Sequence, residues 1–233
     1  MKTNQPMDYK LKGTGQLFIV AIPIGHPKDI TLRALEVLEK SDVVICEEYR
    51  EGSTLLKKNG ILNKELILLN EHNEAEQTPK LILELLNGKH LALISDCGTP
   101  LFADPGTSLV NQVFAYGIRV TPVPGPSSLS AALSISPLPL DHFHFEGFLP
   151  RKNEDRMARL KTLRGLNLPI ILMDAPFRLG KLLDEVNRVF GKSQVVTLAY
   201  NLTLPGETIF HDSVSHVREL TQGMKGEFVL ILH

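Results

Sequence analysis

LFIVAIPIG at Leu17–Gly25 shows the pattern that decides the fold, an apolar run rich in β-branched residues that stops at a proline and a glycine. Such a run predicts a buried strand ending before Pro23. A helix is expected next, because Asp29 or Thr31 can cap a segment whose leucines recur at three-residue spacing over Leu32–Leu38. The chain therefore opens with a strand, a tight turn and a helix.

The same alternation continues through the first half of the chain. Further strands are predicted at Val43–Cys46, Glu65–Leu69, Leu91–Ser95 and Arg119–Val123, and helices at Gln77–Leu86 and Pro105–Tyr116. Strands that alternate with helices over short connections are typical of a parallel sheet covered on both faces. The first half is thus expected to be an α/β domain.

A cluster of prolines and glycine, PVPGPSS at residues 122–128, is the densest helix- and strand-breaking segment. We place a domain hinge at Pro124–Pro126, which gives an N-terminal extension over residues 1–16, one α/β domain over 17–123 and a second over 124–233. In the second half, strands are predicted at Phe143–Glu146, Pro169–Met173, Val195–Leu198, Glu207–Phe210 and Glu227–Leu232, and helices at Ser127–Ser134, Asn153–Arg164, Pro176–Val189 and Val214–Leu220.

Composition excludes several classes of protein. The 233 residues include 25 basic and 26 acidic residues, and this balance argues against bulk electrostatic capture of nucleic acid but leaves room for a local basic patch. Two cysteines without a CxxC pair exclude a disulfide scaffold and a thiolate zinc site. The N-terminus lacks an apolar signal core and no apolar run reaches 18 residues, so a soluble cytoplasmic protein is expected.

Three loops rich in glycine and proline follow predicted strands. They are Pro23-Ile24-Gly25, Asp96–Pro100 with Asp104-Pro105-Gly106, and Pro124–Ser128. The carboxyl ends of strands line the ligand crevice in open α/β sheets, and glycine there permits close backbone approach. Each loop alone is better explained as an ordinary strand–helix turn, but the three together favour a binding site.

Two polar segments are candidates for proton transfer or substrate binding, namely Glu71-His72-Asn73-Glu74 and Glu47-Glu48-Tyr49-Arg50. Both are also explicable as solvated loops. His142 and His144 alternate along a predicted strand, but without a third ligand at a telling spacing a structural role is favoured and no metal is predicted. Dinucleotide, P-loop and nucleophile-elbow signatures are not found in the sequence.

The predicted helix at Asn153–Arg164 and the residues just before it are rich in basic side chains. Six lie in this segment: Arg151, Lys152, Arg156, Arg159, Lys161 and Arg164. A charged helix is commonly a solvated face, yet a basic surface directly after the FEGFLP segment is a place where phosphates can be gripped.

An ordered series of motifs resembles the tetrapyrrole methylase superfamily, the class III S-adenosylmethionine-dependent methyltransferases. The series covers residues 17–232 and is most similar to the branch that methylates the ribose 2′-oxygen of a cytidine in small-subunit ribosomal RNA. The matching segments are LFIVAIPIG with DITLRA, EHNE at 71–74, SDCGTP at 95–100, DPG at 104–106, PGPS at 124–127, FEGFLPRK at 145–152, Ala175-Pro176 with Arg178, and GEFVL at 226–230.

The resemblance implies two α/β domains with S-adenosylmethionine held in the cleft between them, usually in a homodimer. It implies that the cofactor is contacted by Pro23, Asp96, Gly98, Thr99, Ser127, Ser128, Met173, Ala175 and Gly226. The candidates for proton removal are then Glu47, Glu48, Glu71, His72 and Glu74, and the sequence does not choose among them. Candidates for phosphate contact are Arg50, Arg151, Lys152 and Arg178.

The chain departs from the branch's pattern mainly in charged segments that would face substrate. Phe177, for example, stands where the branch's Glu-Ala-Pro-His-Arg motif has histidine. The leading hypothesis is 2′-O-methylation of small-subunit ribosomal RNA, with the ribosomal RNA or small subunit as partner. Two alternatives stay open: methylation of a small molecule such as a tetrapyrrole, and a cofactor-binding protein without catalysis.

Overall fold

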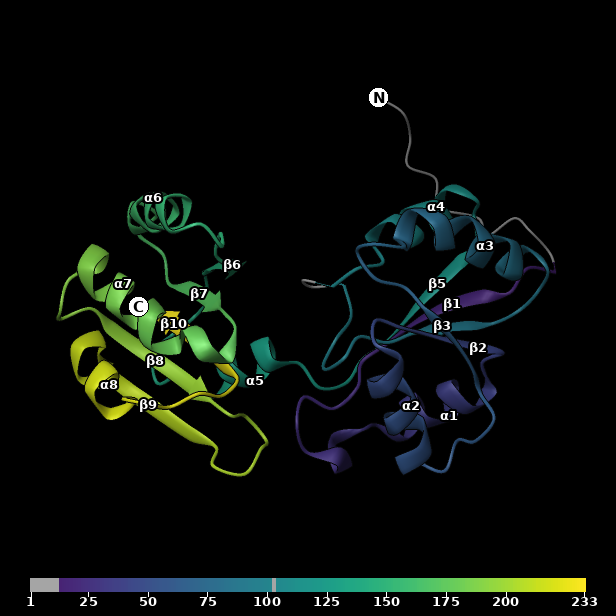
Figure 1. Cartoon of the computed structure of the whole chain (residues 1–233), viewed down its shortest axis with the longest axis horizontal. Helices are drawn as coiled ribbons and strands as arrows, with labels where there is room; N and C mark the ends of the chain where they lie inside the picture. Colours follow the sequence, from purple (N-terminus) through teal and green to yellow (C-terminus); the bar gives the residue numbers. More distant parts are fainter. Residues whose placement is uncertain (1–12, 102–103) are drawn as a thin grey trace. The chain divides into compact units, whose positions relative to one another are not determined.

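The computed structural model describes residues 13–101 and 104–233, and it divides into two compact units, Met1–Ser127 and Ser128–His233. Most of the N-terminal extension predicted over residues 1–16 lies outside the described residues. Both units are mixed α/β structures, as Figure 1 shows, which confirms the predicted fold class of two α/β domains.

The N-terminal unit is built on an all-parallel sheet of order β3-β2-β4-β1-β5. Its strands are β1 (Gln16–Val20), β2 (Val43–Cys46), β3 (Glu65–Leu68), β4 (Leu91–Leu93) and β5 (Arg119–Val123). The connecting helices are η1 (Pro27–Asp29), α1 (Leu32–Lys40), α2 (Tyr49–Lys58), α3 (Glu74–Leu86) and α4 (Thr107–Ala115). Thr31 caps α1 by accepting a hydrogen bond from the Ala34 amide at 3.0 Å, so the second of the two predicted caps is used.

Helices cover both faces of this sheet, as predicted from the alternation of strands and helices. Ala34 and Leu38 of α1 and Leu56 of α2 pack on one face, whereas α3 and α4 supply Leu81, Leu85, Leu109 and Val113 to the other. The helix α2 was not predicted. Gly52 lets α2 pack closely against the end of β2, because a Cβ at residue 52 would come within 2.9 Å of the Cys46 side chain.

The C-terminal unit has a mixed sheet of order β6-β7-β10-β8-β9, in which only β6 and β7 run parallel. Its strands are β6 (His144–Phe148), β7 (Ile170–Met173), β8 (Val195–Tyr200), β9 (Thr208–Ser213) and β10 (Phe228–Leu232). Its helices are α5 (Ser128–Ser134), α6 (Asn153–Arg164), η2 (Pro176–Arg178), α7 (Leu179–Phe190) and α8 (Val214–Leu220). The predicted bounds of α6 are confirmed, whereas the predicted helix at Pro176–Val189 is a 3-10 turn followed by α7.

The two faces of this second sheet are covered unequally (Figure 1). Helices α6, α7 and α8 pack against one face through a large cluster that includes Leu160, Leu183 and Val217. The other face carries a smaller cluster around Ile171 and Ala132 of α5. The described part of the chain contains no helix that is long and apolar enough to cross a membrane.

Candidate active site

The three glycine- and proline-rich loops are tied to one another by hydrogen bonds, two between backbone groups and one from a side chain. The Ile22 amide donates to the Gly98 carbonyl at 2.9 Å, and the Gly98 amide donates to the Pro23 carbonyl at 3.4 Å. The Thr99 hydroxyl donates to the Pro126 carbonyl at 3.1 Å, which joins the third loop to the second. The prediction that these loops gather at the carboxyl ends of the strands is therefore confirmed.

Glycine is required where the loops approach each other most closely. Gly98 has a φ of +72°, and a Cβ there would lie 3.2 Å from the Ile24 side chain. A Cβ at Gly125 would lie 3.2 Å from the Cβ of Ala21. The missing side chains of Gly98 and Gly125 therefore leave room for Ile24 and Ala21. Ser127 and Ser128, the predicted cofactor contacts that follow them, are both partly buried.

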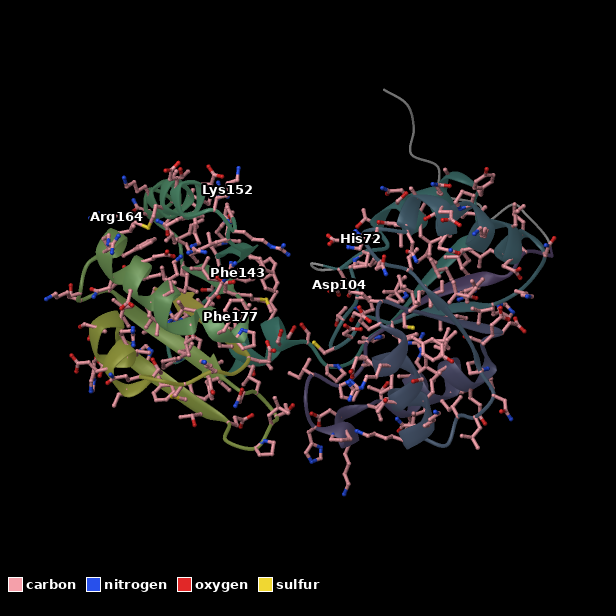
Figure 2. The ribbon with its side chains drawn as sticks, viewed as in Figure 1. His72, Asp104, Phe143, Lys152, Arg164 and Phe177 are labelled. Atoms are coloured by element: carbon pink, nitrogen blue, oxygen red, sulfur yellow. The ribbon has the colours of Figure 1, made fainter. Side chains whose placement is uncertain are left out.

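Acidic side chains gather beside these loops, and we call Glu47, Asp96 and Asp104 the acidic edge. Burial raises the pKa of all three carboxyls. The charge of Asp96 raises the pKa of Glu47 and of Asp104 further. Because a negative charge acts on its neighbours only over short distances, these coupled shifts place the three carboxyls in one local field. Figure 2 shows Asp104 on the same side of the unit as His72.

Asp104 was not among the predicted site residues, although the DPG motif that contains it was singled out. The signal available in the sequence was its place in a loop after a strand, eight residues beyond Asp96. Its burial and its hydrogen bond to Ser95 depend on the fold of the loop. Asp96 itself is exposed, whereas Glu47 and Asp104 are partly buried, so the acidic edge combines partly buried and solvent-facing carboxylates.

The candidates for proton removal do not share one environment. Glu74 caps α4, because its Oε1 accepts hydrogen bonds from the Gly106 amide at 3.1 Å and from the Ser108 amide at 2.9 Å. A carboxylate at a helix N-terminus is stabilised by exposed amides, which gives Glu74 a structural role. Glu71 and His72 lie 3.5 Å apart, with side chains 78% and 85% exposed.

Glu47 and Glu48 follow β2 directly, and only Glu47 is half-buried. The Ile94 amide donates to the Ile45 carbonyl at 2.9 Å, so the end of β2 adjoins the segment that leads into Asp96. Arg50 is exposed in the first turn of α2. Of the five candidates, Glu47 and Glu74 are partly buried, and Glu74 is already committed to capping α4.

In the C-terminal unit, the predicted cofactor contacts lie at two strand ends. Met173 ends β7, and Ala175 follows it. Gly226 lies just before β10, packed so closely on Tyr200 and Asn201 that an added Cβ would overlap both side chains. Gly226 therefore allows the chain to enter β10 beside these residues, which is the kind of close backbone approach that glycine permits.

Most of the basic residues of α6 are committed to structural contacts. Arg156 is buried and donates to both carboxylate oxygens of Glu185 at 2.7 and 2.8 Å. Arg159 forms a similar pair with Glu146, and Arg164 donates to the Val189 carbonyl at 2.8 Å. The expectation of a basic phosphate-binding surface along the helix is thus wrong for Arg156, which is buried. Arg156 and Arg164 join α6 to α7, and Arg159 joins it to β6.

The remaining predicted phosphate contacts of this unit lie in the loops after β6 and β7. Arg151 and Lys152 are exposed, and within the described residues their side chains form no ion pair. Arg178 lies 3.4 Å from Asp174 and also lies over the Phe177 ring, 5.7 Å from its centroid. His144, considered above as a metal ligand, lies 2.8 Å from Glu146, which also binds Arg159.

Comparison with known proteins identifies the family. Residues 16–218 match the sequence model of the family described as Tetrapyrrole (Corrin/Porphyrin) Methylases. This chain is a tetrapyrrole methylase family member. The ribosomal RNA small subunit methyltransferase I of Escherichia coli O157:H7 is 42% identical in an alignment that covers all of this chain and 81% of that protein.

Two solved structures share the fold of this chain. A diphthine synthase structure aligns with a TM-score of 0.74 at 16% identity and covers 94% of this chain and 90% of that one. A uroporphyrin-III C-methyltransferase from Thermus thermophilus, in complex with S-adenosylhomocysteine, aligns with a TM-score of 0.64 at 18% identity and covers 94% and 97%. Family membership confirms the predictions of a methyltransferase and of S-adenosylmethionine as its methyl donor.

The donor set of the N-terminal unit fits this cofactor. S-adenosylmethionine carries positive charge on its sulfonium and its α-ammonium groups, and the acidic edge concentrates carboxylates that repel one another. A bound cation relieves that repulsion. Gly98 is buried in a positive-φ backbone, and a Cβ there would lie 3.2 Å from the Ile24 side chain, so the loop is closely fitted at this point. Charge and shape thus agree with the family's methyl donor.

Proposed function

We propose that this chain transfers a methyl group from S-adenosylmethionine to the ribose 2′-oxygen of a cytidine in small-subunit ribosomal RNA. The observation that carries the proposal is the 42% identity, over the whole chain, with a protein named for methylation of small-subunit ribosomal RNA. The solved tetrapyrrole and diphthine enzymes are 16–24% identical and support the fold alone. Nothing in the described site favours a tetrapyrrole substrate over RNA.

For the cofactor, we propose contacts from the tied loops and from two strand ends of the C-terminal unit. The contacting residues are those expected from the family: Pro23, Asp96, Gly98, Thr99, Ser127, Ser128, Met173, Ala175 and Gly226. The hydrogen bonds among the loops support a pre-organised site, because they fix the backbone before any ligand binds. Pre-organisation lowers the entropy that binding must overcome.

We propose Glu47 as the proton acceptor. S-adenosylmethionine supplies a methyl group already activated on a sulfonium, whose carbon–sulfur bond breaks with its electron pair left on sulfur, so the protein's part is alignment and proton removal. Glu47 takes the proton of the ribose 2′-hydroxyl while the oxygen forms its bond to the methyl carbon. Burial raises the pKa of Glu47, which makes its carboxylate a stronger base than an exposed glutamate at neutral pH.

For the RNA backbone, we propose phosphate contacts from Arg50, Arg151, Lys152 and Arg178. Three of these have exposed side chains and the fourth, Arg178, is partly exposed. We also propose that the protein acts as a homodimer in the cytoplasm, where ribosomal subunits mature. Light scattering on the purified protein measures the oligomeric state, and a monomer at micromolar concentration would refute the dimer.

The function is tested with small ribosomal subunits from cells that lack this protein. Purified protein and S-adenosylmethionine with a labelled methyl group should label the small-subunit RNA, and digestion to nucleosides should yield 2′-O-methylcytidine. Subunits from cells that contain the protein serve as the control, because their site is already methylated. Absence of label in the first subunits, with a different methyltransferase active in the same reaction, would refute the proposal.

A further inference from the structure

Two exposed phenylalanines lie near the ends of neighbouring strands in the C-terminal unit. Phe148 ends β6 and is 53% exposed, and Phe177 lies in the turn after β7 and is 69% exposed. The register pairs Phe148 with Met173, four residues before Phe177. Because paired strands run about 5 Å apart, the segments after β6 and β7 leave the sheet side by side.

Phe177 is held in a defined setting rather than on a loose loop. Its turn is closed by the Arg178 amide, which donates to the Ala175 carbonyl at 2.8 Å, and Pro176 restricts the backbone before it. Arg178 is anchored by Asp174, whose carboxylate is buried and also accepts from the Ala175 amide at 2.8 Å. An arginine over one side of an exposed ring leaves an aromatic surface bordered by positive charge.

Positive charge also borders Phe148. Arg151 and Lys152 follow it by three and four residues, both exposed, and their side chains form no ion pair with any described residue. Figure 2 labels Lys152, at the start of α6, and Phe177. Arg156 and Arg159 of α6 are paired with carboxylates, as described above. Within the described residues, Arg151 and Lys152 therefore keep a positive charge that no ion pair neutralises, close to the end of β6.

We infer that Phe148 and Phe177 form a stacking platform for unpaired bases of an RNA strand, with Arg151, Lys152 and Arg178 contacting the flanking phosphates. The inference rests on the proposed function and adds how the RNA is held. Single-stranded RNA is bound in general by aromatic rings that stack on bases and by cations that follow the backbone. Protein–protein interfaces usually have a continuous apolar core with few charges, whereas this surface has separate aromatic rings among cations, so it fits RNA better than a protein partner.

The decisive experiment compares RNA with and without bases. The probes are a fluorescein-labelled oligocytidylate of about ten nucleotides and the same strand with abasic ribose at its central positions. Wild-type protein should bind the base-containing strand more tightly. Phe177→Ala and Phe148→Ala should each weaken that binding about tenfold while leaving binding of the abasic strand unchanged. Equal loss for both strands, or no loss for either, would overturn the platform.

Conservative variants separate stacking from simple apolar contact. Phe177→Tyr and Phe177→His keep an aromatic face and should retain most of the preference for bases, whereas Phe177→Leu should lose it. Retention of the preference in Phe177→Leu would overturn stacking. Tyr116→Ala is the matched control, since Tyr116 is a 50% exposed aromatic residue at the end of α4 in the other unit and should leave both affinities unchanged.

Salt dependence tests the phosphate contacts separately. Lys152→Ala and Arg151→Ala should each reduce the slope of log affinity against log salt by about 0.7, the value for one contact to a single strand. The phenylalanine variants should lower affinity without a change of slope. If Lys152→Ala and Arg151→Ala leave the slope unchanged, the assignment of these residues to phosphates is wrong.

Two further readouts distinguish failure of the platform from failure of the proposed function. If wild-type protein labels small subunits and the phenylalanine variants label them with unchanged KM and bind oligocytidylate normally, only the platform is refuted. If wild-type protein labels no subunits, the function is refuted. If Phe177→Ala or Phe148→Ala converts a dimer to a monomer without affecting RNA binding, these rings belong to an interface between copies, and the platform is overturned.

Discussion

At the carboxyl end of its sheet the N-terminal unit carries Glu47, Asp96 and Asp104, whereas the C-terminal unit carries Phe148 and Arg178 after β6 and β7. In the first region, burial and repulsion between carboxylates raise the pKa values of these side chains. The second holds exposed rings and cations. One edge therefore suits a cationic ligand and repels phosphate, and the other suits a polyanion with flat bases.

This difference explains how a chain with a formal charge of −1 can use a cationic methyl donor and an RNA substrate. A net charge averages over regions of opposite sign, so it describes neither region. The proposed division of roles also limits where RNA phosphates can lie, since the acidic edge would repel them.

The largest effect is expected from removing the proposed base at the acidic edge. Glu47→Gln should reduce the rate of methyl transfer about 10²–10⁴-fold, the usual contribution of a positioned general base. The wild-type rate should rise with pH through the pKa of Glu47, which burial raises, and then level off, because the carboxylate form accepts the proton. In Glu47→Gln this rise should be lost.

Single-turnover rates from pH 5 to 8 measure both effects. Glu51→Gln is the matched control, because Glu51 lies nearby in α2 and its charge also acts on Asp96. It removes the same charge without removing the proposed base, and its rate should stay within a few-fold of wild type. Similar losses in the two variants would show that the negative field, rather than Glu47, supports the reaction.

The next largest effect concerns the C-terminal unit and its buried ion pair. Arg156→Ala leaves the buried Glu185 carboxylate with only Lys181, 3.9 Å away, and loss of one member of such a buried pair costs about 3–5 kcal/mol in the free energy of unfolding. The double variant Arg156→Met with Glu185→Leu should recover most of that loss. Urea unfolding measures these stabilities. A single variant as stable as wild type would return Arg156 to the candidates for RNA binding.

Many of the strands, helices and loops could be predicted from the sequence, since strand periodicity and glycine-rich turns are local patterns. The helix α6 and the three loops were predicted from such patterns. By contrast, the capping role of Glu74 depends on Gly106 and Ser108, which lie 32 and 34 residues away. Arg156 resembled a solvated cation because its partner Glu185 is 29 residues distant. Local periodicity carries no information about partners this far apart.

The helix α2 was missed for a related reason. Its sequence, YREGSTLLKK, contains a glycine and a polar first turn, which lower helix propensity. Gly52 is explained only by the Cys46 side chain against which it packs. The exposure of Phe148 could not be predicted either, because a strand residue faces the core or the solvent according to the register and the β-bulge between Phe145 and Gly147.

A smaller effect is expected from closing the space at the tied loops. Gly98→Ala places a Cβ 3.2 Å from Ile24 in a backbone with φ of +72°. The close contact and the backbone strain both disturb the loop that is proposed to hold the cofactor. Affinity for S-adenosylmethionine should fall about tenfold, from strain of about 1–2 kcal/mol. Isothermal titration calorimetry measures the affinity directly.

Gly60→Ala is the matched control for this variant. Gly60 has a similar φ of +76°, but nothing lies within 4 Å of an added Cβ. This variant should lose a comparable amount of stability from backbone strain while its affinity for S-adenosylmethionine stays unchanged. Equal affinities in the two variants would indicate that the Gly98 loop does not shape the cofactor site.

The smallest effects are expected when one carboxyl is removed from each unit and the thermal midpoint is measured against pH. Burial raises the pKa of Asp104, so the folded protein holds its proton more tightly than the unfolded chain does. Ionised Asp104 therefore lowers stability at neutral pH, and this penalty disappears as the pH falls through the raised pKa. Asp104→Asn should raise the thermal midpoint at pH 7.5 by about 1–3 °C, and the gain should vanish near pH 4.

Glu146 should behave in the opposite way, because its hydrogen bonds from Arg159 lower its pKa despite burial. Its ionised form stabilises the protein above the pKa of an unfolded glutamate, and that stability is lost as the pH falls through the lowered value. Glu146→Gln should therefore lower the midpoint at pH 7.5, with a smaller loss at low pH. Differential scanning calorimetry of both variants from pH 4 to 7.5 tests the contrast. Shifts of the same sign at pH 7.5 would show that the carboxyls of the two units are not in opposite fields.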